Sequence, residues 1–290
     1  MTSPNDRVFA EIISQYDGSC DLTNVQRIGG GCINEAFKIT CTYGSFFIKT
    51  NSVSELDSFE KEAQGLKKLT ETSIIKTPEV YRTGQTQLSS FLLMEWIEGG
   101  NKSASFWEKF GRKLARQHQI SSNTFGFDYD NYIGRLPQSN SRHPGWSDFF
   151  ISERIEPQIR LASSKRLLDK KTKRDFEIVL TKLDRLIPPE PPALLHGDLW
   201  GGNFLCNENN EPILIDPAIH FGHRETEMAF TTLFSGFDQK FYDAYQNEFP
   251  LMPGFDERVE LHNLYPLLVH VNLFGPSYLS GIKQTLKKFT

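Results

Sequence analysis

The spacing of polar residues between positions 194 and 216 constrains the fold of this chain more than any other feature. Two short apolar runs, Phe204–Asn207 and Pro212–Ile215, are joined by a polar turn and predict a β-hairpin. Asn203 precedes the first run and Asp216 follows the second. The hairpin would therefore hold these two side chains at its open end, on the same side.

The segment before the hairpin reads Leu195-His196-Gly197-Asp198-Leu199-Trp200-Gly201-Gly202-Asn203. Asp198 and Asn203 have the spacing of the loop H-R-D-x-x-x-x-N, in which the aspartate takes a proton from an acceptor hydroxyl. Phosphoryl transfer from ATP needs such a base, and it needs oxygen ligands that hold Mg²⁺ on the phosphates. We therefore expect Asp198 to be the base and Asn203 and Asp216 to be the Mg²⁺ ligands.

The first hundred residues supply the expected phosphate-binding elements. A glycine turn, Gly29-Gly30-Gly31, lies between two predicted strands, and glycines let backbone N–H groups approach phosphate oxygens. Lys49 ends the next strand. On a helical wheel of about 100° per residue, Glu62 falls on the apolar face of the predicted helix Leu56–Thr72, where a charge needs a partner. The sequence predicts a Lys49–Glu62 ion pair.

Cys32 follows the glycine turn directly and has two interpretations. It is either a small buried residue or an exposed thiol whose pKa is lowered by nearby anion-binding amides, which would permit oxidation.

The element pattern predicts an α+β chain with two lobes and a protein-kinase-like fold. Residues 1–98 form a small β-rich lobe with one helix at 4–16, a strand at 89–94 and a hinge near 95–100. Residues 99–290 form a larger, mostly helical lobe. Helices are expected at 105–118, 148–186 with a break near Pro157, 225–234, 239–247 and 258–272, with a polar loop at 121–147.

Composition narrows the class further. The 290 residues carry a formal net charge of −4, which gives no general attraction to nucleic acid or to an anionic membrane. The four cysteines form no C-x-x-C pair, and no apolar run reaches the roughly 18 residues that span a bilayer. The N-terminus lacks a signal-peptide pattern. We expect a cytoplasmic protein that acts as a monomer or homodimer.

Several segments together resemble the fructosamine/ketosamine-3-kinase family, within the superfamily of aminoglycoside phosphotransferases and choline kinases. The resemblance extends over the whole chain, and its most specific segments are Leu194–Asn203 with the tryptophan at 200, Ile215-Asp216-Pro217-Ala218, Phe221-Gly222-His223-Arg224-Glu225 and His270-x-Asn272-Leu273-Phe274-Gly275. One departure is Thr226, where the family often has an aromatic residue.

The resemblance implies ATP- and Mg²⁺-dependent phosphorylation of the sugar 3-hydroxyl of ketosamines, either small molecules or glycated protein lysines. The 3-phosphate adduct then decomposes and frees the amine, so the activity is a deglycation. Glu95, Trp96 and Ile97 would hold adenine through backbone groups. Trp200, His270 and Asn272 would contact the sugar. From its position alone, Trp200 could either wall the acceptor pocket or pack under the loop.

Other functions remain to be separated from this one. A small-molecule kinase with an aminoglycoside or amino alcohol acceptor would share the motifs but needs a strongly acidic pocket. A non-catalytic nucleotide-binding protein would have lost the lysine, the base or a metal ligand, and all of them are present. A protein kinase is disfavoured, because Gly197 replaces the arginine before the aspartate and Asp216-Pro217-Ala218 replaces D-F-G.

Overall fold

The computed structural model describes residues 4–16, 20–29, 33–42 and 44–290. The chain divides into two compact units. The first consists of Met1–Ser103 and Leu205–Pro217, and the second of Ala104–Phe204 and Ala218–Thr290. We describe each unit by itself.

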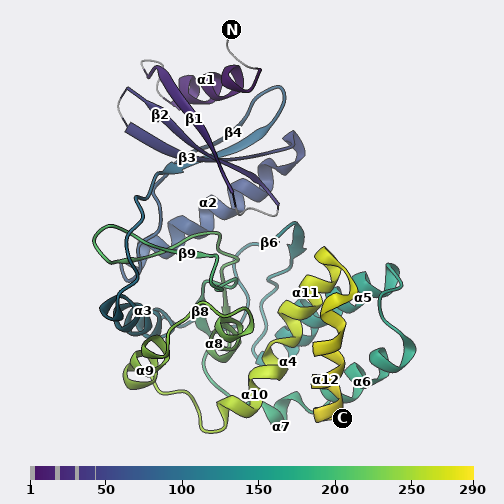
Figure 1. Cartoon of the computed structure of the whole chain (residues 1–290). Helices are drawn as coiled ribbons and strands as arrows, with labels where there is room; N and C mark the ends of the chain where they lie inside the picture. Colours follow the sequence, from purple (N-terminus) through teal and green to yellow (C-terminus); the bar gives the residue numbers. More distant parts are fainter. Residues whose placement is uncertain (1–3, 17–19, 30–32, 43) are drawn as a thin grey trace. The chain divides into compact units, whose positions relative to one another are not determined.

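An antiparallel sheet is the centre of the first unit (Figure 1). Its strand order is β1-β2-β3-β5-β4. The strands are β1 (Leu22–Ile28), β2 (Glu35–Cys41), β3 (Gly44–Asn51), β4 (Val80–Gln85) and β5 (Ser90–Glu95). The strands predicted on either side of the glycine turn, the strand that contains Lys49 and the strand at 89–94 are confirmed, whereas β4 was not predicted.

Helices cover both faces of this sheet, α1 (Pro4–Tyr16) on one and α2 (Leu56–Glu71) on the other (Figure 1). Alternate residues of β5 serve the two faces, because successive side chains of a strand point to opposite sides. Phe91 and Leu93 pack with α1, while Leu92 and Met94 pack with α2. The same alternation places Ile48 on the α1 side and leaves Lys49 on the side of α2.

The predicted hairpin forms from β9 (Phe204–Cys206) and β10 (Pro212–Leu214). Most of it belongs to the first unit, although the sequence placed it with the helical lobe. Backbone hydrogen bonds explain this difference: the Gly100 N–H donates to the carbonyl of Cys206 at 2.7 Å, and the Leu214 N–H donates to that of Lys76 at 2.9 Å. The hairpin thereby extends the first unit.

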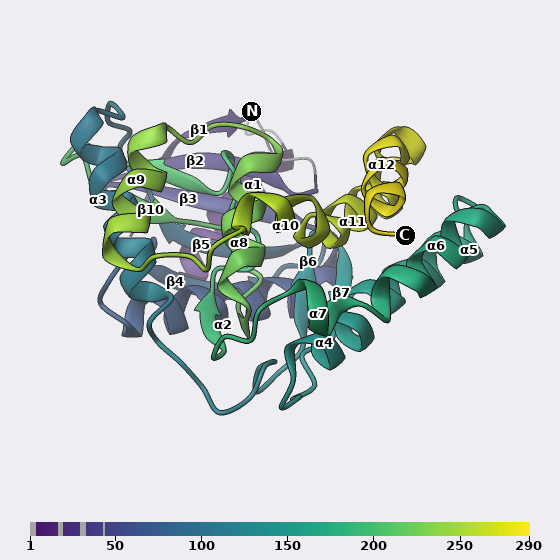
Figure 2. The same cartoon turned by 90° about the horizontal axis from the view of Figure 1, so that it is seen from below.

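The second unit is mostly helical. Its larger core gathers α5 (Glu156–Ser164), α6 (Lys170–Leu180), α11 (Leu264–Phe274) and α12 (Leu279–Phe289), which lie together at one end of the unit (Figures 1 and 2). The remaining elements are α3 (Ala104–Gln117), α4 (Trp146–Phe149), α7 (Leu183–Leu186), α8 (Arg224–Leu233), α9 (Gln239–Glu248), α10 (Phe255–His262), and the short strands β6 (Asn131–Ile133), β7 (Leu136–Gln138), β8 (Ala193–Leu195) and β11 (His220–Gly222). The predicted polar loop at 121–147 thus contains a small β6–β7 hairpin.

Two helix boundaries near prolines differ from the prediction. The expected helix 258–272 is two helices that meet at Asn263, because Pro266 has no N–H to donate to the carbonyl of His262. Pro157 does not break its segment, because it lies in the first turn of α5 and follows a π-helical stretch, Phe150–Ile155. The actual interruption lies at 165–169. None of the helices in the described part of the chain is long and apolar enough to span a bilayer.

Candidate active site

Lys49, Glu62 and Asp216 come together in the first unit. Lys49 Nζ lies 2.7 Å from Glu62 Oε1, as the helical wheel predicted, and it also forms an ion pair with Asp216 Oδ1. Lys49 is buried, whereas the Asp216 side chain is 40% exposed. Burial alone would lower the pKa of Lys49, but the carboxylates of Asp216 and Glu62 raise it above its ordinary value, so the ammonium is charged at neutral pH.

Glu62 responds in the opposite way to the same surroundings. Burial, together with the negative charge of Asp216, raises the pKa of Glu62 to about 7, although Lys49 opposes this shift. The two carboxylates therefore share a single cation. A ligand that drew Asp216 away would leave Lys49 and Glu62 as a simple pair.

The backbone of Asp216 is in the left-handed region, with φ of 57°. This conformation is uncommon for a residue with a side chain, and such strain gathers at functional positions. Asp216 follows β10, so the hairpin carries its carboxylate to Lys49. The predicted role of the hairpin in placing Asp216 has a clear structural basis.

The predicted nucleotide-binding segments are described only in part. Gly29 is exposed and follows β1, whereas Gly30, Gly31 and Cys32 lie outside the described residues. Glu95 ends β5, and its N–H donates to the Glu79 carbonyl at 2.8 Å.

The next two residues of the predicted hinge, Trp96 and Ile97, are partly exposed. Trp96 Nε1 donates to Glu98 at 2.7 Å, and Lys38 Nζ lies 4.2 Å from the centre of the Trp96 ring. Ile97 follows Trp96 directly and is half-buried.

Asp198 and Asn203 come together in the second unit, in a segment that we call the catalytic loop after its predicted role (residues 196–203). Asn203 Nδ2 donates to the Asp198 carbonyl at 2.8 Å and to Asp198 Oδ2 at 2.9 Å. The Asp198 N–H donates to Nδ1 of His196 at 3.2 Å, so His196 has a structural contact within the loop. The spacing that singled out this pair therefore reflects direct hydrogen bonds.

The donor chemistry of Asn203 and Asp216 suits Mg²⁺, which prefers carboxylate and amide oxygens. The amide nitrogen of Asn203 is engaged by Asp198, which leaves the amide oxygen as its metal-binding atom. Asn203 belongs to the second unit and Asp216 to the first, so their joint coordination of one ion stays a prediction.

A cavity in the second unit adjoins Asp198. Its wall combines the catalytic loop with aromatic, apolar and a few polar residues: Ile133, Trp146, Phe150, Arg154, Leu195, Gly197, Asp198, His220, Thr226, Glu227, Phe230, His262, Tyr265, Pro266, Val269 and His270. A cavity that is mostly apolar, with a few polar groups and a carboxylate at its wall, suits a small organic acceptor.

The three predicted sugar-contact residues occupy different surroundings. His270 lines the cavity and packs on Phe234, with 4.6 Å between the ring centres. Trp200 is 38% exposed and also contacts Phe234, with 6.2 Å between the ring centres. Asn272 is buried, and its Nδ2 donates to the carbonyl and Oε1 of Gln158 at 3.0 and 2.8 Å. The structure thus groups Trp200 and His270 and places Asn272 in a contact with α5.

Arg154, Tyr265 and Thr226 line the cavity, although the sequence analysis gave them no role in the site. Arg154 is 1% exposed; its Nη2 donates to Asn140 at 2.6 Å, and burial lowers its pKa to about 10, so it stays cationic at neutral pH. Tyr265 donates to Gln138, and Thr226 begins the wall contributed by α8. Nothing in the local sequence distinguishes the buried Arg154 from an exposed helical arginine, whereas the departure at Thr226 was a usable signal.

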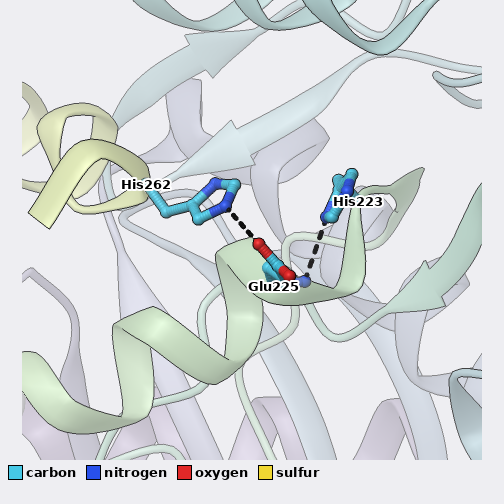
Figure 3. Close-up of side chains that lie close together, drawn as sticks. All are labelled: His223, Glu225 and His262. Carbon is cyan, nitrogen blue, oxygen red and sulfur yellow. Dashed lines mark hydrogen bonds and ion pairs between the residues drawn. The ribbon is translucent and has the colours of Figure 1, made fainter. Parts of the chain in front are cut away.

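A second cluster has the composition of a metal centre: His223 and Glu225 at the start of α8 and His262 at the end of α10, all buried (Figure 3). Hydrogen bonds already occupy it. Nδ1 of His223 accepts from the Glu225 N–H at 3.3 Å, and Nε2 donates to the Pro188 carbonyl at 3.0 Å. Arg258 donates to Glu225 Oε2 at 2.8 Å. A cation would have to displace a guanidinium, so we interpret the cluster as a structural network.

Comparison with known proteins identifies the family of this chain. The model of the fructosamine kinase family matches residues 5–290. A ketoamine kinase of Enterococcus faecium is 37% identical, covering 90% of this chain and 93% of the relative. A chloroplastic protein-ribulosamine 3-kinase of Arabidopsis thaliana is also 37% identical, covering 97% and 87%.

Solved structures place the fold in the protein-kinase-like class. A fructosamine-3-kinase structure from Haemophilus somnus has a TM-score of 0.87 at 29% identity, covering 98% of this chain and 97% of that one. An aminoglycoside phosphotransferase shares the fold at a TM-score of 0.66 and 15% identity. The family model matches nearly the whole chain, and Lys49, Asp198, Asn203 and Asp216 are all present. This chain therefore belongs to the fructosamine kinase family.

Proposed function

We propose that this protein transfers the terminal phosphoryl group of ATP to the 3-hydroxyl of ketosamines. The observation that carries the proposal is that Asp198 lines a cavity of the second unit whose accessible wall is mostly apolar. A sugar hydroxyl bound there would reach a carboxylate that can take its proton. The names of the relatives supply the acceptor class. Decomposition of the 3-phosphate would free the amine and make the activity a deglycation.

Each residue of the candidate site has a proposed role that suits its chemistry. Lys49, oriented by Glu62, would contact the phosphates, with the amides of the glycine turn. Asn203 and Asp216 would hold Mg²⁺, which neutralises charge on the phosphates when it is bound. Asp198 would orient the acceptor hydroxyl and take its proton. Trp200 and His270 would supply an aromatic wall for the sugar.

An aminoglycoside acceptor fits the cavity less well. Such a molecule is a polycation and needs unpaired carboxylates around it. Arg154 places a positive charge in the wall, and backbone N–H groups already engage the carboxylate of Glu227. The charge balance of the cavity therefore favours a neutral or singly charged sugar.

The test combines a substrate panel with a variant of the base. The protein is incubated with Mg²⁺, ATP and either ketosamines or aminoglycosides, while ADP release and the site of sugar phosphorylation are followed. We expect turnover with ketosamines, and Asp198→Asn should lower kcat by about 10²–10⁴-fold with near-normal ATP affinity. Full activity of Asp198→Asn would refute the assigned base, and preferential turnover of aminoglycosides would refute the acceptor class.

A further inference from the structure

His220 has no part in the chemistry described so far, although it lines the cavity that adjoins Asp198. It lies on β11 and is 5% exposed. Its ring packs against Gly197, the residue directly before Asp198, since a Cβ built at Gly197 would lie 3.1 Å from His220 Nδ1. A titratable side chain therefore lies in the cavity wall, close to the proposed base and without an assigned role.

The contacts of His220 determine which of its ring nitrogens carries the hydrogen. Nδ1 lies 3.0 Å from the carbonyl oxygen of Ala218, which can only accept, so Nδ1 is the donor. Burial lowers the pKa of His220 well below its usual value, and the positive charge of Arg154 adds to this effect. The ring is therefore neutral at neutral pH, and its other nitrogen, Nε2, is a hydrogen-bond acceptor.

This acceptor is unused. In the described part of the chain, Nδ1 is the only His220 ring nitrogen that has a hydrogen-bond partner. A Cβ built at Gly222 would lie 2.9 Å from Nε2, so the glycine leaves room around this nitrogen. A buried polar atom without a partner is unfavourable, and such atoms in native proteins are uncommon. A ligand in the cavity that donates a hydrogen to Nε2 would satisfy it.

His270, which also lines the cavity, has the same arrangement. Its Nδ1 lies 2.7 Å from the carbonyl oxygen of Pro266, so this nitrogen carries the hydrogen and Nε2 is the acceptor. Burial lowers the pKa of His270 as well, which keeps the ring neutral at neutral pH. The wall thus combines two neutral imidazole acceptors with the carboxylate of Asp198. A molecule that fits this wall must bring several hydrogen-bond donors.

The charge near His220 selects the kind of donor. A ketosamine carries neutral hydroxyl groups and an amine that is protonated at neutral pH. The Cζ atom of the buried Arg154 lies 4.5 Å from the centre of the Phe149 ring, on which His220 also stacks with 5.8 Å between the ring centres. A positive charge at this distance repels an ammonium group, whereas a hydroxyl carries no net charge. The amine should therefore lie away from His220, and a sugar hydroxyl should lie next to it.

We propose that His220 is a specificity-determining residue: its Nε2 accepts a hydrogen bond from a hydroxyl of the ketosamine on C4, C5 or C6, beyond the phosphorylated C3 as seen from the amine. The inference rests on the proposed function, because the ketosamine must occupy the cavity with its reacting hydroxyl at Asp198. A site built to bind a hydroxyl rejects an analogue that lacks it, since the protein acceptor is then left buried and unpaired. The acceptor class is therefore narrowed to ketosamines that have this second hydroxyl free.

His143 provides a matched control. Its ring also packs on Phe149, with 6.1 Å between the ring centres. Its Nε2 is already engaged, 3.0 Å from Glu153 Oε1, and His143 is absent from the described residues that line the cavity. His143→Phe and His220→Phe therefore replace a histidine on the same aromatic ring, but only the second removes an open acceptor from the cavity wall.

The experiment measures kcat/KM for a ketosamine and KM for ATP, at a temperature well below the unfolding transition of each variant. We expect His220→Phe to lower kcat/KM for the ketosamine by about 10-fold, the scale of one buried hydrogen bond. His220→Gln, whose amide oxygen can reach the place of Nε2, should recover at least about 3-fold of this loss. KM for ATP should change by less than about 2-fold in both variants, because the groups proposed to bind phosphate are unchanged.

His143→Phe should keep kcat/KM for the ketosamine within about 2-fold of the unmodified protein. Equal losses in the two phenylalanine variants would show that packing on Phe149 is the cause and would overturn the inference. An unchanged kcat/KM in His220→Phe, or no recovery in His220→Gln, would also overturn it.

A second measurement changes the substrate instead of the protein, using ketosamines that lack the hydroxyl of C4, C5 or C6. We expect the unmodified protein to use one of these analogues about 10-fold less well than the parent ketosamine. With that analogue, the unmodified protein and His220→Phe should differ by less than about 2-fold, because the contact is already missing. If the full 10-fold difference between the two proteins persisted with every analogue, His220 would not act through a hydroxyl, and the inference would be overturned.

The analogues also give a result if His220→Phe does not fold, because equal use of all three by the unmodified protein would overturn the inference without any substitution. The same experiments separate this inference from the proposed function. If the unmodified protein turned over no ketosamine, the proposed function and the role of His220 would both be overturned. Normal ketosamine turnover together with an unchanged His220→Phe would overturn only the role of His220.

Discussion

Gly197 shows how strictly a single backbone position is determined here. Its φ of 86° lies in the region that favours glycine, and a Cβ built at this residue would lie 2.0 Å from the carbonyl oxygen of Ala218. That oxygen cannot easily move aside, because it belongs to the backbone of Ala218, whose own N–H donates to the His196 carbonyl. Neither the conformation nor the space admits a side chain.

Gly197→Ala should therefore destabilise the protein by about 2–5 kcal/mol and reduce activity by more than its unfolded fraction explains. Left-handed backbone strain and a backbone clash both contribute to this value. The measurement is urea unfolding together with the specific activity of the folded fraction. Gly281→Ala is the control, because this glycine lies inside α12 with only ordinary contact distances around it, and it should be neutral or stabilising. Similar effects of the two substitutions would contradict the argument.

At the scale of the element, α8 carries its polar residues on two sides. Glu225 faces His262 and Arg258, while Glu227 faces the catalytic loop and His118. His223 caps the helix by accepting the Glu225 N–H. Because His223 and Glu225 are buried, their protonation is coupled to the folding of the whole segment.

The direction of this coupling follows from the pKa values. Burial, with the nearby His262, lowers the pKa of His223 to about 4; for Glu225, burial alone would raise the pKa, but Arg258 and His262 hold it at about 2. At a pH between the ordinary pKa of each group and its lowered pKa in the folded protein, the unfolded chain binds more protons than the folded protein. Stability is therefore fully present at neutral pH and falls as the pH drops from about 6.5 toward 4, with Glu225 adding to the loss below about 4.5.

We expect acid destabilisation on the order of 3 kcal/mol from His223 alone. His223→Asn, which can still cap the helix but does not titrate, should flatten the stability curve between pH 6.5 and 4. Unfolding temperature as a function of pH is the readout. A variant curve with the same slope as the unmodified protein would show that other groups control the acid transition.

Local periodicity predicted the elements that depend on nearby residues, and it predicted one tertiary contact. The Lys49–Glu62 pair could be found because strand alternation and helical spacing each leave one charge on an apolar face. The contact of Lys49 with Asp216 could not, since it joins residues far apart in the chain. The contact of Glu227 with the N–H groups of His196 and Gly197 was hidden for the same reason, because these residues are far apart in the chain.

For the whole molecule, ligand binding should act on stability, because the nucleotide would bind the folded protein and not the unfolded chain. We expect Mg²⁺ with ATP at about 100 times its Kd to add about 2.7 kcal/mol and raise the unfolding temperature by several degrees. Asp216→Ala should lose the Mg²⁺-dependent part of this increase. An equal Mg²⁺-dependent shift in that variant would argue against Asp216 as a metal ligand. Differential scanning fluorimetry with ATP, with and without Mg²⁺, makes the comparison.

Most of the β9–β10 hairpin belongs to the first unit, and this affects how chimaeric proteins of this family should be designed. The chain crosses from one unit to the other after Ser103, after Phe204 and after Pro217, so no single cut yields the two intact bodies. A fragment that stops at Ser103 would lack the strand that delivers Asp216 to Lys49. A chimaera that takes its N-terminal half from a relative should therefore take residues 205–217 from the same parent. Otherwise the paired Lys49 and Asp216 would come from two different proteins.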